Sequence, residues 1–149
     1  MDDRVRKLGT KKKFDYFFYD GPVPELISEY ETMFALHKLT GKTMRGTPAP
    51  TDVNAGFLVK YNGEVICGYY INLVEGKEEI QIVLAYTLEE FRGRGIWKTL
   101  LKYIDKIAIE KNKLNIFAYI KTNNQEMINT TLANGYSMIA AVVHRKVKT

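Results

Sequence analysis

Two glycines and two arginines stand together in residues 92–97, Arg-Gly-Arg-Gly-Ile-Trp, between an apolar stretch at 80–87 and a helical pattern. After the glycines, apolar residues recur every three or four positions, beginning with Trp97, Leu100 and Leu101. The first amides of a helix lack intrahelical acceptors and carry partial positive charge, and glycine lets a phosphate approach the main chain. Residues 92–97, called the glycine loop below, therefore have the chemistry of an anion site that would fit a pyrophosphate.

The common phosphate-binding motifs do not fit the glycine loop. A P-loop needs a closing Gly-Lys-Ser/Thr, which is absent here. A dinucleotide fingerprint needs a third glycine and an early place in the chain, whereas this loop follows strands with an antiparallel pattern. Two glycines beside a helix also occur in plain turns. The order of the surrounding elements must therefore decide whether the glycine loop is an anion site.

Length and composition favour one domain without a metal centre. The 149 residues are 46% hydrophobic, which suffices for a single core. Cys67 is the one cysteine, and the sequence has only two histidines, so neither a disulfide framework nor a zinc cluster is expected. We interpret Cys67 as an inert core thiol. No apolar run approaches the roughly 20 residues that span a bilayer, and the first residues lack a secretory pattern. We therefore expect a cytoplasmic protein that does not contact membranes.

The net charge of +5 is concentrated at the two ends of the chain. Residues 1–13 carry +4 and the last five residues carry +3, which leaves −2 on residues 14–144. This distribution argues against a nucleic-acid interface and indicates a solvated basic segment. We accordingly expect a basic segment at 1–12 and a single domain at 13–149.

Hydrophobic periodicity predicts an α/β (α+β) chain in the order β-α-β-β-β-α-β-α-β. Asn62-Gly63 predicts a type I′ hairpin. Residues 40–53, with two glycines and two prolines, form a loop, and His37 continues an apolar helical stripe that we assign to the core. The predicted strands are 13–19, 56–61, 64–72, 79–87 and 114–120, with helices at 25–38, from 96 to about 111 and at 124–134, and one or two closing strands in 136–147.

At this point the chain resembles the GNAT superfamily of acetyl-CoA-dependent N-acetyltransferases. The similarity is carried by residues 56–68, by residues 82–101, by residues 116–120 and by Asn124 with the later Gly135-Tyr136. It implies a mixed, mostly antiparallel central sheet flanked by helices. It also implies acetyl-CoA as acyl donor and direct attack by a primary amine, either a protein lysine or N-terminus or a small cationic amine.

The resemblance also assigns the residues that bind the donor. The family pattern of Arg or Gln, two residues, Gly, one residue, then Gly or Ala departs only at its last position, where a tryptophan is expected to pack inward. The pantetheine arm would lie in a gap beside strand 114–120, and a backbone N–H near Ala85 would face the thioester carbonyl. Asn124 matches a pantetheine-binding asparagine, although a helix N-cap explains it too. The assigned residues are Arg92, Gly93, Arg94, Gly95, Ile96 and Trp97 for the pyrophosphate, and Ala85, Tyr86, Thr87 and Asn124 for the pantetheine.

Two catalytic residues follow from family spacing. An amine acceptor is protonated at pH 7, because a lysine-type ammonium has a pKa of about 10.4, so a base is needed. Glu79, thirteen residues before the glycine loop, is the candidate, with Glu78 as a rival and a polar strand end as the plain alternative. If the strand is regular, Gln81, Val83 and Ala85 share its face.

The second catalytic position is occupied by Thr131, where many relatives have a tyrosine that protonates the leaving thiolate. Threonine is a poor acid, so water, Tyr119 or Tyr86 are alternatives. This departure and Trp97 keep open an acyl-CoA-binding protein without turnover. The basic ends and the many tyrosines keep open a basic nucleic-acid-binding module. The segment after Gly135 is short for two closing strands, so one strand is either missing or supplied by a partner, which leaves a homodimer open.

Overall fold

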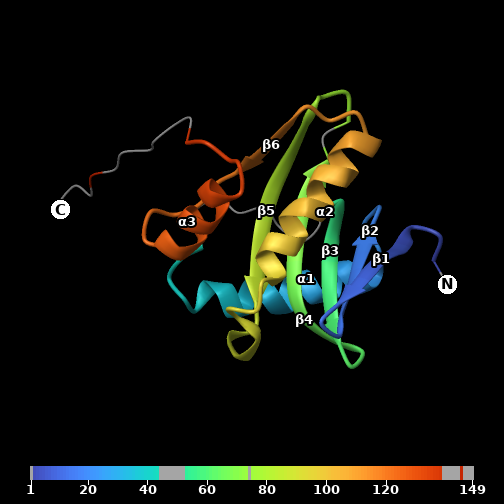
Figure 1. Cartoon of the computed structure of the whole chain (residues 1–149), viewed down its shortest axis with the longest axis horizontal. Helices are drawn as coiled ribbons and strands as arrows, with labels where there is room; N and C mark the ends of the chain where they lie inside the picture. Colours follow the sequence, from blue (N-terminus) through green and yellow to red (C-terminus); the bar gives the residue numbers. More distant parts are fainter. Residues whose placement is uncertain (1, 44–52, 74, 139–144, 146–149) are drawn as a thin grey trace.

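One mixed sheet organises the part of the chain that the structure describes. The computed structural model covers residues 2–43, 53–73, 75–138 and 145 (Figure 1). Six strands lie in the order β1-β2-β3-β4-β5-β6, antiparallel except for the parallel pair β5–β6. The elements are β1 (Val5–Lys11), β2 (Phe14–Tyr19), α1 (Pro24–Lys38), β3 (Ala55–Tyr61), β4 (Glu64–Leu73), β5 (Glu79–Thr87), the short 3₁₀ helix η2 (Glu89–Phe91), α2 (Ile96–Glu110), β6 (Asn115–Ala118) and α3 (Gln125–Ala133).

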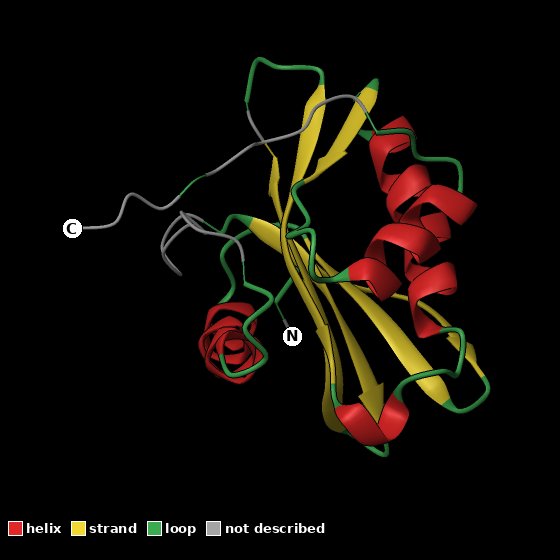
Figure 2. Cartoon of the chain, turned by 90° about the vertical axis from the view of Figure 1, so that its left-hand side faces the viewer, coloured by secondary structure: helices red, strands yellow, loops and turns green. Residues whose placement is uncertain are grey.

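Helices cover both faces of this sheet, with α1 on one side and α2 on the other (Figure 2). Leu100, Ile104 and Ile107 recur at helical spacing along α2 and are at most 1% exposed. Each such side chain contributes about 2 kcal/mol through burial. The opposite face holds a second buried cluster around α1, which includes Leu26, Tyr30, Met33, Leu58 and Tyr70. The expected sheet flanked by helices is therefore confirmed.

The hairpin between β3 and β4 forms as the sequence predicts. Asn62 and Gly63 both adopt left-handed backbone angles, with φ of 50° and 82°. A type I′ turn requires positive φ at both central positions, and asparagine and glycine adopt it with little strain. The hairpin places β4 next to β5, the strand that leads to the glycine loop.

A strand in the basic N-terminal part was not expected. Residues 5–11 form β1 and pair antiparallel with β2, through a turn in which Lys12 and Lys13 have φ of 52° and 69°. Lysine rarely adopts this conformation, so the sequence carries no turn signal there. Two basic residues of the strand are in ion pairs, Arg6 with Glu110 at 2.8 Å and Lys7 with Asp15 at 3.4 Å.

The middle of β5 is irregular, which corrects the expected arrangement of its side chains. Tyr70 of β4 pairs with Leu84 and the next residue, Ile71, pairs with Ile82, so Val83 is an extra residue in β5. A bulge of this kind shifts the alternation of the strand. Ala85 consequently packs with the cluster around α2, whereas alternation from Ile82 places Gln81 and Glu79 on the α1 face.

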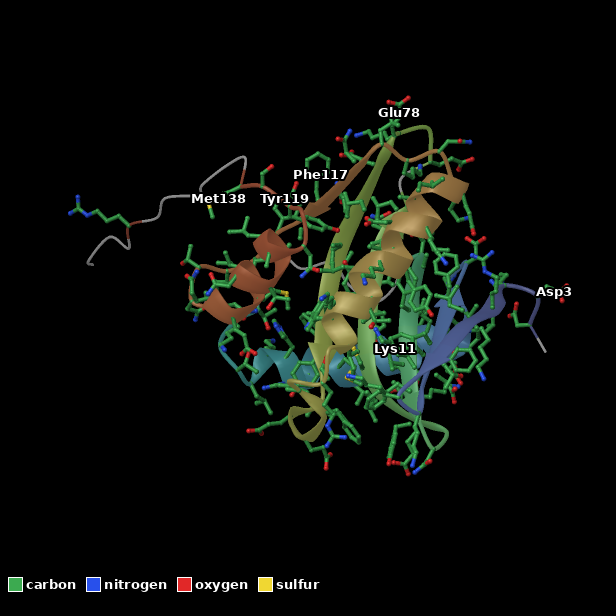
Figure 3. The ribbon with its side chains drawn as sticks, viewed as in Figure 1. Asp3, Lys11, Glu78, Phe117, Tyr119 and Met138 are labelled. Atoms are coloured by element: carbon green, nitrogen blue, oxygen red, sulfur yellow. The ribbon has the colours of Figure 1, made fainter. Side chains whose placement is uncertain are left out.

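The C-terminal part is described only as far as α3 and the residues after it. Strand β6 is shorter than the predicted 114–120, and residues 136–138 are not in a strand. Most of the predicted closing strands at 136–147 lies outside the described residues. Tyr119, just after β6, and Met138, after α3, are 65% and 67% exposed (Figure 3). Among the helices of the described ranges, none combines the length and apolar character needed to cross a bilayer.

Candidate active site

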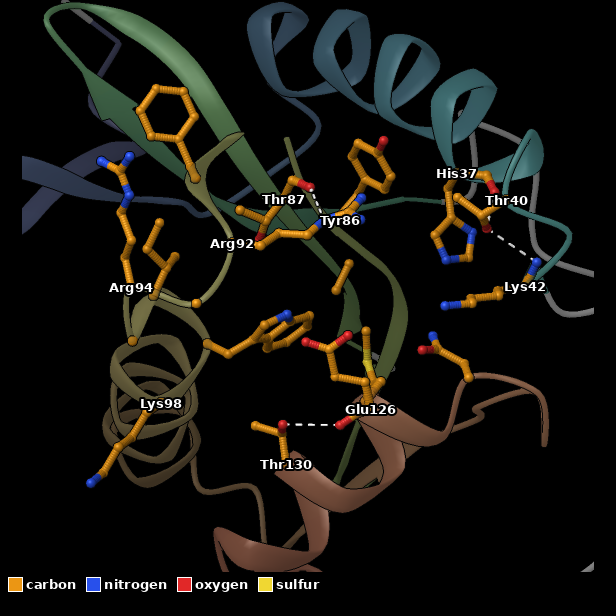
Figure 4. A pocket seen from close by; sticks show the side chains of 18 residues that line it. His37, Thr40, Lys42, Tyr86, Thr87, Arg92, Arg94, Lys98, Glu126 and Thr130 are labelled. Atoms are coloured by element: carbon orange, nitrogen blue, oxygen red, sulfur yellow. Dashed lines mark hydrogen bonds between the residues drawn. The ribbon is translucent and has the colours of Figure 1, made fainter. Parts of the chain in front are cut away.

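A cavity of about 330 Å³ opens where β5 ends and α2 begins. It is bounded by the end of α1, by β5, by the glycine loop and by the first turns of α3 (Figure 4). All the residues that the sequence assigns to the donor line this one cavity, although they come from three separate segments. They are Ala85, Tyr86, Thr87, Arg92, Gly93, Arg94, Gly95, Ile96, Trp97 and Asn124.

The glycine loop has the backbone of an anion site. Gly93 and Gly95 are left-handed, with φ of 75° and 78°, and open space lies where a Cβ would stand on either residue. Gly95 is the N-cap of α2, and its carbonyl accepts the Thr99 amide at 3.2 Å. The amides in the first turn of α2 lack intrahelical acceptors and carry the positive end of the helix dipole. The main chain of the loop is therefore open to the approach of a phosphate group, because no heavy atom of the described residues, apart from those adjoining each glycine, lies within 4 Å of where a Cβ would stand.

Both arginines of the loop rest against the protein at the edge of the cavity. The Arg92 Nε donates to the Thr87 carbonyl at 3.0 Å, and its guanidinium lies 5.2 Å from the centre of the Tyr86 ring. The Arg94 guanidinium donates to the Glu90 carbonyl at 3.2 Å. These contacts keep two positive charges beside the glycine loop, where they favour an anionic ligand.

Trp97 packs inward as the sequence predicts. It contacts the buried cluster around α2, and its ring meets the Tyr69 ring edge-on with centroids 5.2 Å apart. The same residue still lines the cavity. The large side chain is thus accommodated from the core side, and the loop glycines stay open.

Strands β5 and β6 separate beside the cavity, which leaves an open strand edge. Their parallel pairing runs from Glu79 with Asn115 to Ile82 with Ala118, and the described residues contain no further pair between them. Strand β5 continues to pair with β4 as far as Thr87. The free edge of β5 from the bulge to Thr87 can therefore accept an extended amide-containing chain by strand addition.

Asn124 is the N-cap residue of α3, but its side chain makes no capping hydrogen bond. It lines the main cavity and also a smaller cavity of about 40 Å³ on the side of β6. Of the two explanations for this asparagine, the geometry favours a contact with a ligand over a structural cap.

The two predicted catalytic residues lie outside both cavities. Glu79 is at the start of β5, 25% exposed and 3.9 Å from the Lys77 amine. The Thr131 hydroxyl donates to the Met127 carbonyl at 2.7 Å, within its own helix, and the neighbouring Thr130 lines the main cavity instead. The structure brings neither residue to the open edge of β5.

Several cavity residues were missed by sequence reasoning. Most of them are polar, from the end of α1, the following loop and the exposed face of α3. His37 belongs to the apolar stripe of α1, which predicts a core residue, and Thr40 and Lys42 fall in a stretch without periodicity. They are His37, Thr40, Lys42, Phe91, Lys98, Glu126, Met127 and Thr130.

His37 lies where the two cavities meet. It is 9% exposed, lines both of them and points from α1 toward the interior (Figure 4). Its Nδ1 is 2.7 Å from the Thr43 hydroxyl, which holds the ring. Burial lowers the pKa of His37 below its ordinary value, and the positive charges of Arg92 and Lys42 lower it further. The imidazole is therefore neutral at pH 7.

Several solved structures that share this architecture are acetyltransferases. An aminoglycoside acetyltransferase from an uncultured soil metagenomic sample, in complex with sisomicin, is 10% identical, with a TM-score of 0.66 over 92% of this chain and 97% of that one. The aminoglycoside acetyltransferase AAC(6')-Iy with a CoA bisubstrate analogue is 14% identical, with a TM-score of 0.64 over 91% and 99%. Ribosomal-protein-alanine N-acetyltransferase from Brucella melitensis biovar Abortus 2308 is 14% identical, with a TM-score of 0.65 over 89% and 99%.

These similarities are of fold, since the identities are low. No curated protein sequence matches the chain. The sequence model of the acetyltransferase (GNAT) family matches residues 20–136, which is most of the chain and includes the glycine loop, the open edge of β5 and α3. The chain is therefore an acyltransferase that belongs to the acetyltransferase (GNAT) family.

Proposed function

We propose that this acyltransferase transfers the acetyl group of acetyl-CoA to a primary amine, by direct attack of the amine on the thioester. One observation carries the proposal. Three parts of the chain that are far apart in sequence line the same cavity. They are the glycine loop, the open edge of β5 and Asn124, whose side chain makes no capping hydrogen bond. This set supplies an anion site for a pyrophosphate and strand-edge groups for the amides of a pantetheine arm.

Acetyl-CoA is the acyl donor of this family, and it supplies an acetyl group activated as a thioester. The structures with this fold support an amine acceptor. One was solved with the aminoglycoside sisomicin, another with a CoA analogue joined to an aminoglycoside, and a third is an acetyltransferase of ribosomal-protein alanine. An amine nucleophile is common to these acceptors. We propose a protein lysine or N-terminus, or a small cationic amine, as the acceptor here.

The roles of the cavity residues follow from their positions. The amides of the glycine loop and the nearby Arg92 and Arg94 would hold the pyrophosphate. The open edge of β5 would align the pantetheine, and a backbone N–H near Ala85 would donate to the thioester oxygen as negative charge develops. Asn124 would contact the pantetheine arm.

Thermal shift and isothermal titration with acetyl-CoA, with adenosine diphosphate as the control, test donor binding. We expect stabilisation by acetyl-CoA well beyond that by the nucleotide, because in the proposed site only acetyl-CoA would contact both the glycine loop and β5. Release of free coenzyme A thiol in the presence of a panel of amines then tests transfer. If acetyl-CoA binds but no amine of the panel causes release of its thiol, a binding protein without turnover is favoured. Absence of acetyl-CoA binding would contradict the assignment of the cavity.

A further inference from the structure

Five residues line both cavities, at the point where the main cavity meets the gap between β5 and the segment after β6 that would take the pantetheine arm, so they would border the thioester. They are His37, Lys42, Ala85, Asn124 and Met127. A proton acceptor needs a lone pair of suitable basicity at this junction. Lys42 ends in an ammonium group, which has donors only, and an asparagine amide is a very weak base. His37 therefore has the side-chain chemistry of a base at this point.

We infer that the imidazole of His37 accepts the proton that the amine loses when it attacks the acetyl thioester, an inference that rests on the proposed function. The amine enters in its neutral form, its ammonium proton having gone to water, and its nitrogen forms a bond to the carbonyl carbon as the carbon–sulfur bond breaks. The coenzyme leaves as a thiolate, and the amine proton moves to Nε2 of His37. The imidazolium then returns a proton to the thiolate or to water, so the residue ends the cycle neutral.

The surroundings of His37 suit it to this step. Nδ1 lies 2.7 Å from the Thr43 hydroxyl, and a proton on Nδ1 donated to this oxygen leaves the lone pair on Nε2. The ring is further held edge-on to Tyr86, and the Thr40 hydroxyl donates to the His37 carbonyl at 2.6 Å. A base fixed in this way loses little entropy when it takes the proton.

The charges around His37 keep the free imidazole neutral. Burial lowers its pKa, and the positive charges of Arg92 and Lys42 act in the same direction. A neutral imidazole at pH 7 is the form that accepts a proton. The titratable or charged groups that line the two cavities with it are Arg92, Arg94 and Lys98 from the glycine loop and α2, Lys42 from the loop after α1, Tyr86 from β5, Tyr119 and Lys121 from the segment after β6, and Glu126 from α3.

Glu79 is the competing base from sequence. Its carboxylate lies beside Lys77 at the far end of β5, three residues before the last pair with β6 at Ile82, and it borders neither cavity. The two assignments therefore predict opposite outcomes for matched amide variants.

The test compares His37→Gln with Glu79→Gln in the full chain, by steady-state acetylation of an amine acceptor and by calorimetric titration with coenzyme A. We expect His37→Gln to lower kcat/KM by about a hundredfold or more, as is usual for loss of a general base, while coenzyme affinity stays within about twofold. Glu79→Gln should lower it by less than about threefold. The reverse result would overturn the inference and make Glu79 the base. A wild-type protein that acetylates no amine would instead refute the proposed function itself, and the role of His37 with it.

The pH profile separates a base from a merely structural residue. In the wild type, kcat/KM should fall as the pH drops below the pKa of His37, which lies under the ordinary 6.5, because the imidazole becomes protonated. Ionisation of the acceptor amine adds a second limb at higher pH that moves with the acceptor, whereas two acceptors of different basicity should share the limb near the pKa of His37, since that limb belongs to the enzyme. The limb should be absent in His37→Gln. A limb below 6.5 that persists in His37→Gln would contradict the inference.

Nuclear magnetic resonance gives a readout that needs no turnover. His37 and His144 are the only histidines in the sequence, so the imidazole signal that disappears in His37→Gln is that of His37, and the one that remains is that of His144. The His37 signal should titrate below 6.5 and at the midpoint of the kinetic limb. If His37→Gln does not fold, Thr43→Val removes the Nδ1 partner and should lower kcat by about tenfold. A His37 midpoint above 6.5, or an unchanged rate in Thr43→Val together with an unchanged limb, would count against the assignment.

Discussion

The ring of His37 meets the ring of Tyr86 edge-on, with centroids 5.9 Å apart and planes at 90°. Tyr86 is also covered by the Arg92 guanidinium, 5.2 Å from its ring centre. One aromatic ring thus joins the last turn of α1 and the glycine loop to the open end of β5. Three of the segments that border the main cavity are thus held together beside the open edge of β5.

Gly95→Glu should abolish most of the affinity for coenzyme A. The substitution puts a side chain and a negative charge over the glycine loop, at a φ of 78° where a Cβ now has open space. We expect a loss of about 2 kcal/mol or more, close to thirtyfold, in a calorimetric titration. Gly76→Glu is the matched control, because Gly76 has a φ of 75°, equally open surroundings and a position outside the cavities. Equal affinity in the two variants would refute the anion site.

Asn124→Ala should weaken coenzyme binding and leave stability nearly unchanged. The side chain makes no capping hydrogen bond, so its removal costs α3 little, whereas a lost contact to the pantetheine arm costs about 0.5–1.5 kcal/mol. Chemical denaturation and titration with coenzyme A measure both effects. A drop in the free energy of unfolding of about 1 kcal/mol with unchanged affinity would show that Asn124 is a structural cap.

Replacement of Lys12 and Lys13 by Asn and Gly should stabilise the protein. Both lysines are left-handed, which costs about 1 kcal/mol each, and Asn-Gly suits the type I′ turn. The melting temperature should rise by about 2–4 °C for each kcal/mol gained. The converse change, Asn62 and Gly63 to two lysines, should lower it. If β1 does not fold with the rest of the domain, the first replacement will leave the melting temperature unchanged.

Cys67 should resist thiol reagents in the folded protein. The side chain is 0% exposed, and this burial raises the pKa of the thiol to about 12. The reactive thiolate is therefore scarce at pH 8. The contribution of this thiol to the free energy of unfolding is therefore fully present below its ordinary pKa of 9.0. It is lost as the pH rises from 9.0 toward about 12, because the thiol then ionises in the unfolded chain before it ionises in the folded one. Labelling with and without denaturant measures the effect. Rapid labelling of the native protein would show that Cys67 is accessible.

The sequence alone determined the elements whose signals are local. Helical spacing in α2, the Asn62-Gly63 turn and the glycines that begin α2 are each set by neighbours in the chain, and the structure has all three. The residues assigned to the donor also meet in one cavity, because the family pattern records which segments come together.

Only the tertiary structure decided what depends on packing between distant segments. The turn at Lys12 and Lys13 opposes local preference, so pairing of β1 with β2 must stabilise it. The bulge at Val83 changes which face Ala85 occupies, and no residue type announces it. His37 looks like one more core position of an amphipathic helix. Its place between two cavities arises because β5 and β6 separate beside the end of α1, a relation between segments about 45 residues or more apart that no local pattern encodes.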